Sequence, residues 1–190
     1  NSITKQMMII EITSRLNNAS VLPSNDRMQL LVVVRAMVDD MNLDCDDPTL
    51  ISYRCAKCKR LVSDEKESCM NLECPFGSGI KSPINITSIN VLVNLKDDTG
   101  YLVGCRLRDA AAEEAFSCSA DIMRGMTREQ LKNLKNKYCK KLCNVRMQVI
   151  GPSTNFQSAI YIILAINVIE SEDDNYEPLN VDELDLNSYE

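Results

Sequence analysis

Residues 89–108 read INVLVNLKDDTGYLVGCRLR, and this stretch is decisive for the fold. Its first half alternates apolar and polar side chains, which predicts a strand with one face in a core. The turn residues Asp97-Asp98-Thr99-Gly100 then reverse the chain. The second half alternates as well, and its expected inward side chains are Val103, Cys105 and Leu107. The sequence therefore predicts a β-hairpin with one buried face and one polar face.

Further strand patterns flank this hairpin. Residues 28–38, MQLLVVVRAMV, form an apolar, β-branched run between turn-forming segments. Residues 142–150 alternate again, and a last strand is expected over residues 158–169. The N-terminal residues 3–16 fit either a strand or a buried helix, because their apolar run does not distinguish the two.

Two helices are expected between the hairpin and residue 142. Asp109 is a suitable N-cap for the alanine-rich stretch after it, and Thr127 with Gln130 forms a capping box for the second helix. The resulting order is strand, cysteine-rich insertion, hairpin, helical segment, strand, strand. This order predicts a mainly β fold, a five-stranded oligonucleotide/oligosaccharide-binding (OB) barrel with its helical segment between strands 3 and 4. We expect the OB-fold domain to span residues 1–169.

Four of the nine cysteines form two close pairs, Cys55-Ala-Lys-Cys58 and Cys69-Met-Asn-Leu-Glu-Cys74. Two intervening residues let the first pair grip one ion in a tight knuckle, and the second pair can complete a tetrahedral zinc site. The chain has no histidine, so the site would be all-cysteine, without an open position for catalytic water. Four unrelated cysteines are the alternative. The sequence predicts a zinc ribbon at residues 53–78 that holds one structural Zn²⁺.

The other cysteines fall in apolar or helical surroundings, a pattern typical of a reducing compartment rather than of a disulfide scaffold. We expect them to be packing residues: Cys45, Cys105, Cys118, Cys139 and Cys143. The sequence has no charged leader followed by an apolar run and no run of 18 apolar residues. Neither a signal peptide nor a membrane span is therefore expected.

Charge is distributed unevenly along the chain. Residues 1–50 carry four basic and seven acidic side chains, residues 51–150 seventeen and eleven, and residues 151–190 none and nine. Attraction to phosphate is local and is screened over about 10 Å. The middle of the chain can therefore bind a polyanion although the whole chain has a net charge of -6. Residues 170–190 are expected to form an acidic, mobile tail.

The insertion followed by the stretch LKDDTGYLVGC at residues 95–105 resembles the third DNA-binding domain of the replication protein A large subunit. A second set of residues is more similar to the C-terminal OB domain of the meiosis-specific OB-domain proteins (MEIOB). These residues are Ala112-Glu113-Glu114, Cys118, Met126-Thr127-Arg128-Glu129-Gln130 and Leu134-Lys135. The resemblance covers about residues 3–169. The OB subunit of the shieldin repair complex carries a related domain.

This resemblance implies binding of single-stranded DNA and association with replication protein A and with a dedicated recombination partner protein. It also implies a nuclear, chromosomal role in meiotic homologous recombination and double-strand-break repair. In the replication protein an assembly helix follows the domain, whereas here Pro178 and acidic residues follow. The resemblance therefore gives no expectation for the mode of assembly.

Candidate DNA contacts follow from the polar strand faces and the ribbon. The side chains expected on the hairpin and the fourth strand are Asn94, Lys96, Arg106, Arg108 and Arg146, with Tyr101 placed to stack on a base. The ribbon adds Lys57, Lys59 and Arg60 as possible clamps on the backbone. Ordinary solvated faces are the alternative explanation for these side chains.

Two functions of different class remain open. In the first, the domain binds single-stranded DNA in a groove. In the second, it is a protein–protein assembly module, of the shieldin type or one that recruits a partner, with little DNA binding of its own. The sequence lacks the clustered carboxylates that two-metal nuclease chemistry needs. We therefore expect a protein that is not an enzyme.

Overall fold

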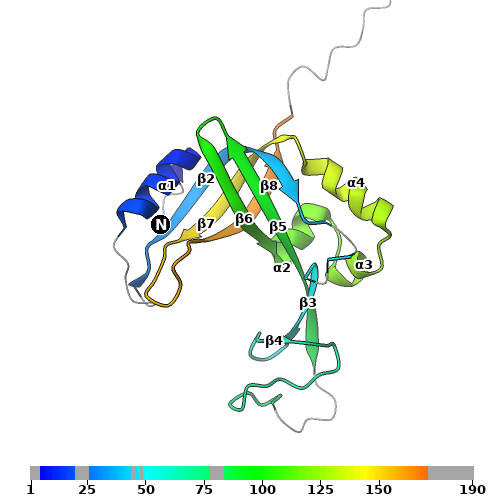
Figure 1. Ribbon diagram of the computed structural model, residues 1–190. Coiled ribbons are helices and arrows are strands. Elements are labelled where there is room, and N and C mark those ends of the chain that lie inside the picture. Colours follow the sequence, from blue (N-terminus) through cyan, green and yellow to red (C-terminus); the bar gives the residue numbers. More distant parts are fainter. Residues whose placement is uncertain (1–4, 20–25, 44–45, 48, 78–83, 171–190) are drawn as a thin grey trace, which may run out of the picture.

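The computed structural model describes residues 5–19, 26–43, 46–47, 49–77 and 84–170 (Figure 1). Within these ranges the strands are β1 (Lys5–Gln6), β2 (Gln29–Met41), β3 (Ile51–Cys55), β4 (Leu61–Val62), β5 (Asn85–Asp97), β6 (Gly100–Arg108), β7 (Leu142–Ile150) and β8 (Ile160–Val168). The helices are α1 (Ile9–Asn18), α2 (Asp109–Phe116), α3 (Ala120–Arg124) and α4 (Arg128–Tyr138). The chain is mainly β, as predicted. Cys45 and the tail from residue 171 lie outside the described residues.

Five of the described strands pair in a closed ring. β2 pairs with β7, β7 with β8, β8 with β6, β6 with β5, and β5 again with β2. β2 can pair with two neighbours because Gln29–Met37 lies along β7 and Met37–Met41 lies along β5. The helices α2, α3 and α4 separate the third strand of the ring, β6, from the fourth, β7, as predicted.

The expectation of five strands is nevertheless incomplete, because the described sheet has eight. β1 lies beside β2, in parallel. β3 pairs with the first half of β5, and β4 pairs with β3. Figure 1 shows that β3, β4 and the start of β5 project from the ring as an arm. We call residues 51–77 together with 84–88 the arm.

The ring strands are built from alternating apolar residues whose inward side chains form one core. Those exposed by at most 1% include Val32, Val34, Val38, Val91, Val93, Cys105, Leu107, Val145, Met147 and Ile163. Burial of an aliphatic side chain of this kind contributes about 1.5–3 kcal/mol relative to its exposure. The β-branched composition that predicted these strands therefore also stabilises the ring.

The inward-outward alternation of β6 changes phase at Gly104. At this point β6 has one residue more than β5, which forms a β-bulge. Gly104 has a left-handed φ of 71°, which glycine adopts without a steric cost, and its N–H donates to Asn94 Oδ1 at 3.0 Å. The strict alternation predicted for residues 101–108 is therefore wrong before the bulge. Leu102 points into the core, whereas Val103 is 70% exposed.

The ambiguous N-terminal segment forms the helix α1 after the short strand β1. Ile9 and Ile12 are its buried residues. The turn of the β5–β6 hairpin caps this helix, because Asp97 Oδ2 accepts the Ile9 N–H at 2.8 Å and Thr99 Oγ1 accepts the Ile10 N–H at 3.0 Å. The polar turn residues therefore satisfy donors that every helix leaves unpaired at its N-terminus.

The helical segment consists of three helices, α2, α3 and α4, instead of the expected two. Asp109 does not cap α2: it is the first helical residue, with a φ of 52°, and the residue before it makes no side-chain capping bond. The capping box of α4 is confirmed, since Thr127 and Gln130 each accept a backbone N–H from the other. Among the described residues, no helix is long and apolar enough to cross a membrane.

Candidate functional site

The four paired cysteines converge at the far part of the arm. Their Sγ atoms all lie within 4.8 Å of one another, with Cys55 and Cys74 3.6 Å apart and Cys58 and Cys69 3.4 Å apart. A tetrahedral ion with metal–sulfur bonds of about 2.3 Å would place its sulfurs about 3.8 Å apart. A disulfide would need about 2.05 Å. These four residues could therefore hold one metal ion.

The first cysteine pair lies in the turn between β3 and β4. The Lys59 N–H donates to the carbonyl of Cys55, and the Cys55 N–H donates to the carbonyl of Arg60, both at 2.9 Å. Lys59 has a left-handed φ of 61°, which closes the turn tightly enough to bring the two sulfurs to one side. The Cys-x-x-Cys spacing thus produces the knuckle that the sequence predicted.

The second pair is shaped by close backbone contacts. The Asn71 N–H donates to Cys69 Sγ at 3.5 Å, and the Gly77 N–H donates to the carbonyl of Cys74 at 2.7 Å. A side chain at residue 77 would not fit, because a Cβ there would lie 2.3 Å from the carbonyl oxygen of Asn71. Gly77 therefore permits the turn that closes the cluster.

The electrostatics of the cluster fit a site for a cation. A backbone hydrogen bond from Arg60 lowers the pKa of Cys58 to about 6. A backbone hydrogen bond from Asn71 acts to lower the pKa of Cys69 too, but burial and the sulfurs of Cys58 and Cys55 outweigh it and raise that pKa to about 11. The first thiolate thus forms readily, and like charge opposes the next. A bound cation would remove this repulsion.

The donor set leaves little room for metal catalysis. All four donors are sulfurs, three of them on buried residues and Cys58 on a half-buried one. Four protein ligands would complete a tetrahedral site and leave no position for substrate or water. A metal ion held by all four sulfurs would therefore be structural.

A groove of about 540 Å³ lies between the arm and the outer face of β5 and β6. Its basic lining consists of Arg54 from β3 and of Arg106 and Arg108 from β6. Tyr53 and the 39%-exposed Leu92 provide a ring and an apolar surface beside them. The groove therefore combines three guanidinium groups, of which Arg108 is paired with Asp109 at 3.8 Å, with surfaces that a flat, partly apolar ligand can contact.

A second cavity of about 490 Å³ adjoins the groove and shares Arg54 and Arg108 with it. Lys59 also lines this cavity. The Arg54 Nη1 donates to the Lys59 carbonyl at 3.1 Å, while its buried Nε has no hydrogen-bond partner among the described residues. The structure thus brings the predicted residues Lys59, Arg106 and Arg108 together, and Arg54 connects the two spaces.

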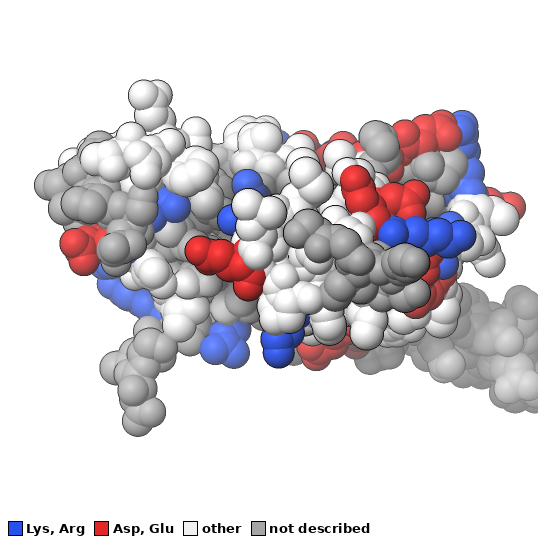
Figure 2. Space-filling model, turned by 90° about the horizontal axis from the view of Figure 1, so that it is seen from below, with Lys and Arg blue, Asp and Glu red and all other residues white. Residues whose placement is uncertain are grey.

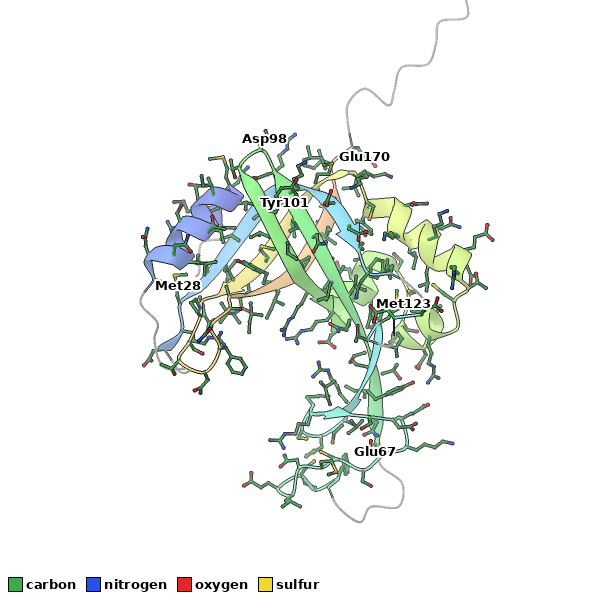
Figure 3. All side chains as sticks on the ribbon, in the orientation of Figure 1. Met28, Glu67, Asp98, Tyr101, Met123 and Glu170 are labelled. Atoms are coloured by element: carbon green, nitrogen blue, oxygen red, sulfur yellow. The ribbon has the colours of Figure 1, made fainter. Side chains whose placement is uncertain are left out.

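Lys57 and Arg60 are exposed on the arm and line neither space. Lys96 and Tyr101 lie at the hairpin end, with Lys96 Nζ 5.3 Å from the centre of the Tyr101 ring. Figure 3 shows Tyr101 and Asp98 at the end of the molecule opposite Glu67 of the arm. The predicted stacking residue is therefore remote from the groove.

Asn94 and Arg146, the two remaining predicted DNA contacts, line neither the groove nor the second cavity. Asn94 holds the bulge at Gly104 through its side-chain oxygen. Arg146 is exposed on β7, and β2 and β8 stand between β7 and the β5–β6 pair in the ring. Arg146 therefore faces away from the groove.

Two further side chains with possible functional roles were not expected from the sequence. Phe156, in the loop between β7 and β8, is 60% exposed, and the Arg27 guanidinium lies 5.6 Å from its ring centre. A phenylalanine among the turn residues of GPSTNFQS is a signal that could have been noted. Arg124 of α3 reaches the arm, and nothing in its local sequence indicates this.

On the face shown in Figure 2, the described basic side chains do not form one continuous patch. Seen from below, the described Lys and Arg side chains are interspersed with acidic ones (Figure 2). On this face, attraction of a polyanion would therefore depend on individual arginines and lysines rather than on a broad positive field.

Comparison with known proteins gives partial matches. No family model matches the sequence. A Rattus norvegicus protein described as "Meiosis-specific with OB domain-containing protein" is 32% identical over 103 residues, which are 54% of this chain and 21% of that protein. The Homo sapiens protein of the same description is 25% identical over 91 residues, 46% of this chain and 19% of that protein. "Protein hold'em" of Drosophila melanogaster is 24% identical over 173 residues, 90% of this chain and 35% of that protein.

Among solved structures, a chain of a replication protein A heterotrimer bound to ssDNA matches with a TM-score of 0.57. The match covers 88% of this chain and 37% of that chain, at 12% identity. It shows that the fold is shared. The chain spans only a minor part of the length of each of these proteins.

Proposed function

We propose that this chain, whose OB domain is similar to those of the meiosis-specific OB-domain proteins, binds single-stranded DNA in the groove between the arm and β5–β6. The observation that carries the proposal is the position of Arg54, Arg106 and Arg108 around one groove. In OB folds, oligonucleotides bind across the second and third strands and the loop between the first and second. Here those parts are β5, β6 and the arm.

The groove residues divide into two roles. Arg54, Arg106 and Arg108 bind backbone phosphates, which gives affinity without sequence preference. Tyr53 and Leu92 contact the faces of unpaired bases, and a stacked base contributes about 1–3 kcal/mol. With one aromatic side chain in the groove, the domain alone binds weakly and depends on neighbouring domains for tight binding.

The metal ion belongs to the same proposal. One Zn²⁺ held by Cys55, Cys58, Cys69 and Cys74 orders the arm, which carries Tyr53 and Arg54 to the groove. Zinc is favoured because the donors are four sulfurs at tetrahedral separations. The ion is structural, and the protein is not an enzyme.

The proposed biological setting is homologous recombination in meiosis and repair of double-strand breaks. The protein would act in the nucleus, on chromosomes, with replication protein A and a dedicated recombination partner. The names of the relatives support the meiotic setting. The fold of the replication protein A chain supports single-stranded DNA as the ligand.

The test is salt-dependent binding of fluorescent oligo-dT. Arg106→Ala with Arg108→Ala should weaken binding and reduce the slope of log K against log salt by about 1.4, since each contact to a single strand contributes about 0.7. Arg146→Ala removes one positive charge from the other side of the ring and should change neither quantity, whereas Arg106→Ala or Arg108→Ala alone should reduce the slope by about 0.7. Equal effects of the two changes would exclude the groove as the binding site.

An assembly module is the second candidate, favoured by one observation. Met70 and Leu72, on the loop between two of the cysteines, are 81% and 85% exposed. Exposed apolar side chains that lie close together are suited to contact with another protein. Under this alternative, Met70→Ser with Leu72→Ser would abolish co-purification of a partner and leave oligo-dT binding unchanged.

A further inference from the structure

One side chain of the helical segment reaches across to the arm. Arg124 Nη1, at the end of α3, donates to Glu65 Oε2 at 3.0 Å and lies 3.5 Å from the Tyr53 hydroxyl. Its Nη2 lies 3.7 Å from Asp121 of the same helix. A single guanidinium thus connects α3 with two different parts of the arm, β3 and the loop before Cys69.

The loop that carries Glu65 is itself fixed to the arm. The Asn85 side chain, at the start of β5, donates to the carbonyl of Glu65 at 2.9 Å and to that of Glu67 at 2.8 Å. The backbone of this loop therefore moves with β5 and the cysteine cluster. An interaction at the Glu65 carboxylate is therefore transmitted to the whole arm through these hydrogen bonds.

The direction of the arm determines the shape of the groove. Tyr53 and Arg54 line the groove from the arm, and Arg106 and Arg108 line it from the ring. In Figure 3, Met123 of α3 lies at the root of the arm and Glu67 farther out along it. The contact of Arg124 is therefore placed where a small rotation of the arm widens or narrows the groove.

We propose that Arg124 is a positioning residue that latches the arm to α3 and so sets the opening of the groove. Its effect on DNA rests on the function proposed above, whereas the latch itself is independent of that function. The Arg124 and Glu65 side chains are 42% and 53% exposed. An ion pair of such exposure shifts a two-state equilibrium by at most about fivefold, so the affinity for DNA changes by no more than that factor.

The experiment measures the arm directly. Spin labels are attached to a ketone amino acid incorporated at Leu72 of the arm and at Asn144 of β7, both exposed, so that the native cysteines are left intact. The distance distribution is recorded by double electron–electron resonance for the parent protein, Arg124→Gln, Glu65→Gln and the double variant. Lys132→Gln is the control, since Lys132 is an exposed charge on α4 with no ion pair to the arm among the described residues. Metal content and thermal melting verify that each variant is folded.

Both single changes should broaden the distance distribution, the double variant should add nothing further, and Lys132→Gln should leave it unchanged. High salt should broaden the distribution of the parent but not of Arg124→Gln, because the latch is screened. Oligo-dT affinity should fall two- to fivefold in both single variants. An unchanged distance distribution in Arg124→Gln refutes the latch, whatever happens to DNA binding. A broadened distance distribution with unchanged affinity for oligo-dT refutes the claim that Arg124 sets the opening of the groove. If the parent does not bind oligo-dT, the function proposed above fails and the distances alone decide on the latch.

Discussion

Replacing Cys58 with serine should abolish binding of the proposed zinc ion and unfold the arm while the ring stays folded. The structure has two separate buried clusters, a large one in the ring and a small one in the arm. The small cluster consists of Cys55, Cys69 and Cys74, with Cys58 and Phe76 packed against them. Nothing else in the described arm forms a core.

The magnitude follows from these two clusters. Burial of a few thiols and one half-buried ring supplies only a few kcal/mol, whereas structural zinc supplies about 10–16 kcal/mol of apparent binding energy. The proposed zinc ion would therefore account for most of the stability of the arm. Serine is a far poorer zinc ligand than a thiolate, so Cys58→Ser should lower the metal content from about one ion per chain to well below half of one.

Elemental analysis and hydrogen exchange measured by mass spectrometry provide the assay. Amide exchange across the first knuckle, where Lys59 and Cys55 are hydrogen-bonded, should accelerate at least about a hundredfold. Exchange in β2 and β7 should stay within a factor of about three. Cys118→Ser, the same substitution outside the cluster, should change the rate of amide exchange in neither region. One ion per chain retained by Cys58→Ser, or equal acceleration in the ring, would refute the reasoning.

Three further outcomes are expected. Gly104→Ala should lower the free energy of unfolding by about 1–2 kcal/mol in urea titrations. The φ of residue 104 is 71° and the added Cβ would meet no atom within 4 Å, so backbone strain is the one cost of the change. A loss above about 4 kcal/mol would contradict this explanation. Thr127→Ala should destabilise by about 1 kcal/mol in the same assay through loss of the capping box, and no loss would show that the cap is dispensable. Burial acts to raise the pKa of Asp97, but hydrogen bonds from Ile9, Thr99 and Gly100 outweigh it and hold that pKa below its usual value. The ionised Asp97 carboxylate therefore stabilises the fold at neutral pH, and this contribution is lost as the pH falls below about 4. Asp97→Asn should lower the melting temperature at pH 7, and the difference from the parent protein should shrink in acid. Thermal melts recorded across pH measure this difference.

Features with a local cause could be predicted from the sequence. The spacing of Cys55, Cys58, Cys69 and Cys74 brings their sulfurs together because each pair is joined by a short turn. The strand at residues 28–38 and the capping box at Thr127 follow from neighbouring residues in the same way. The order along the chain of the hairpin, the helical segment and the last two ring strands was also correctly expected, because each of these elements has a local sequence pattern.

Features that depend on distant residues could not be predicted in this way. Val103 points outward because Asn94, on the other strand, holds the bulge at Gly104. Arg146 looked equivalent to Arg106 because both lie on polar strand faces, but the order of strands around the ring separates them. Arg124 meets Glu65 only after the arm and α3 have packed, and 59 residues separate them in the chain.

The arm leaves and rejoins the ring at neighbouring backbone positions. The Asn42 N–H donates to the carbonyl of Leu92 at 3.1 Å, and the Leu92 N–H donates to Asn42 Oδ1 at 2.6 Å. Residues 43–91 therefore lie between two residues that are hydrogen-bonded to each other. Leu43, Leu50 and Ile89 of this segment belong to the core of the ring, whereas the described residues 52–77 and 84–88 do not. Because the entropy of closing a loop grows only slowly with its length, a turn of a few residues or a different module could replace this outer part with little change in the stability of the ring. In evolution, such an element can be gained, lost or exchanged in one insertion or deletion without shifting the register of any ring strand.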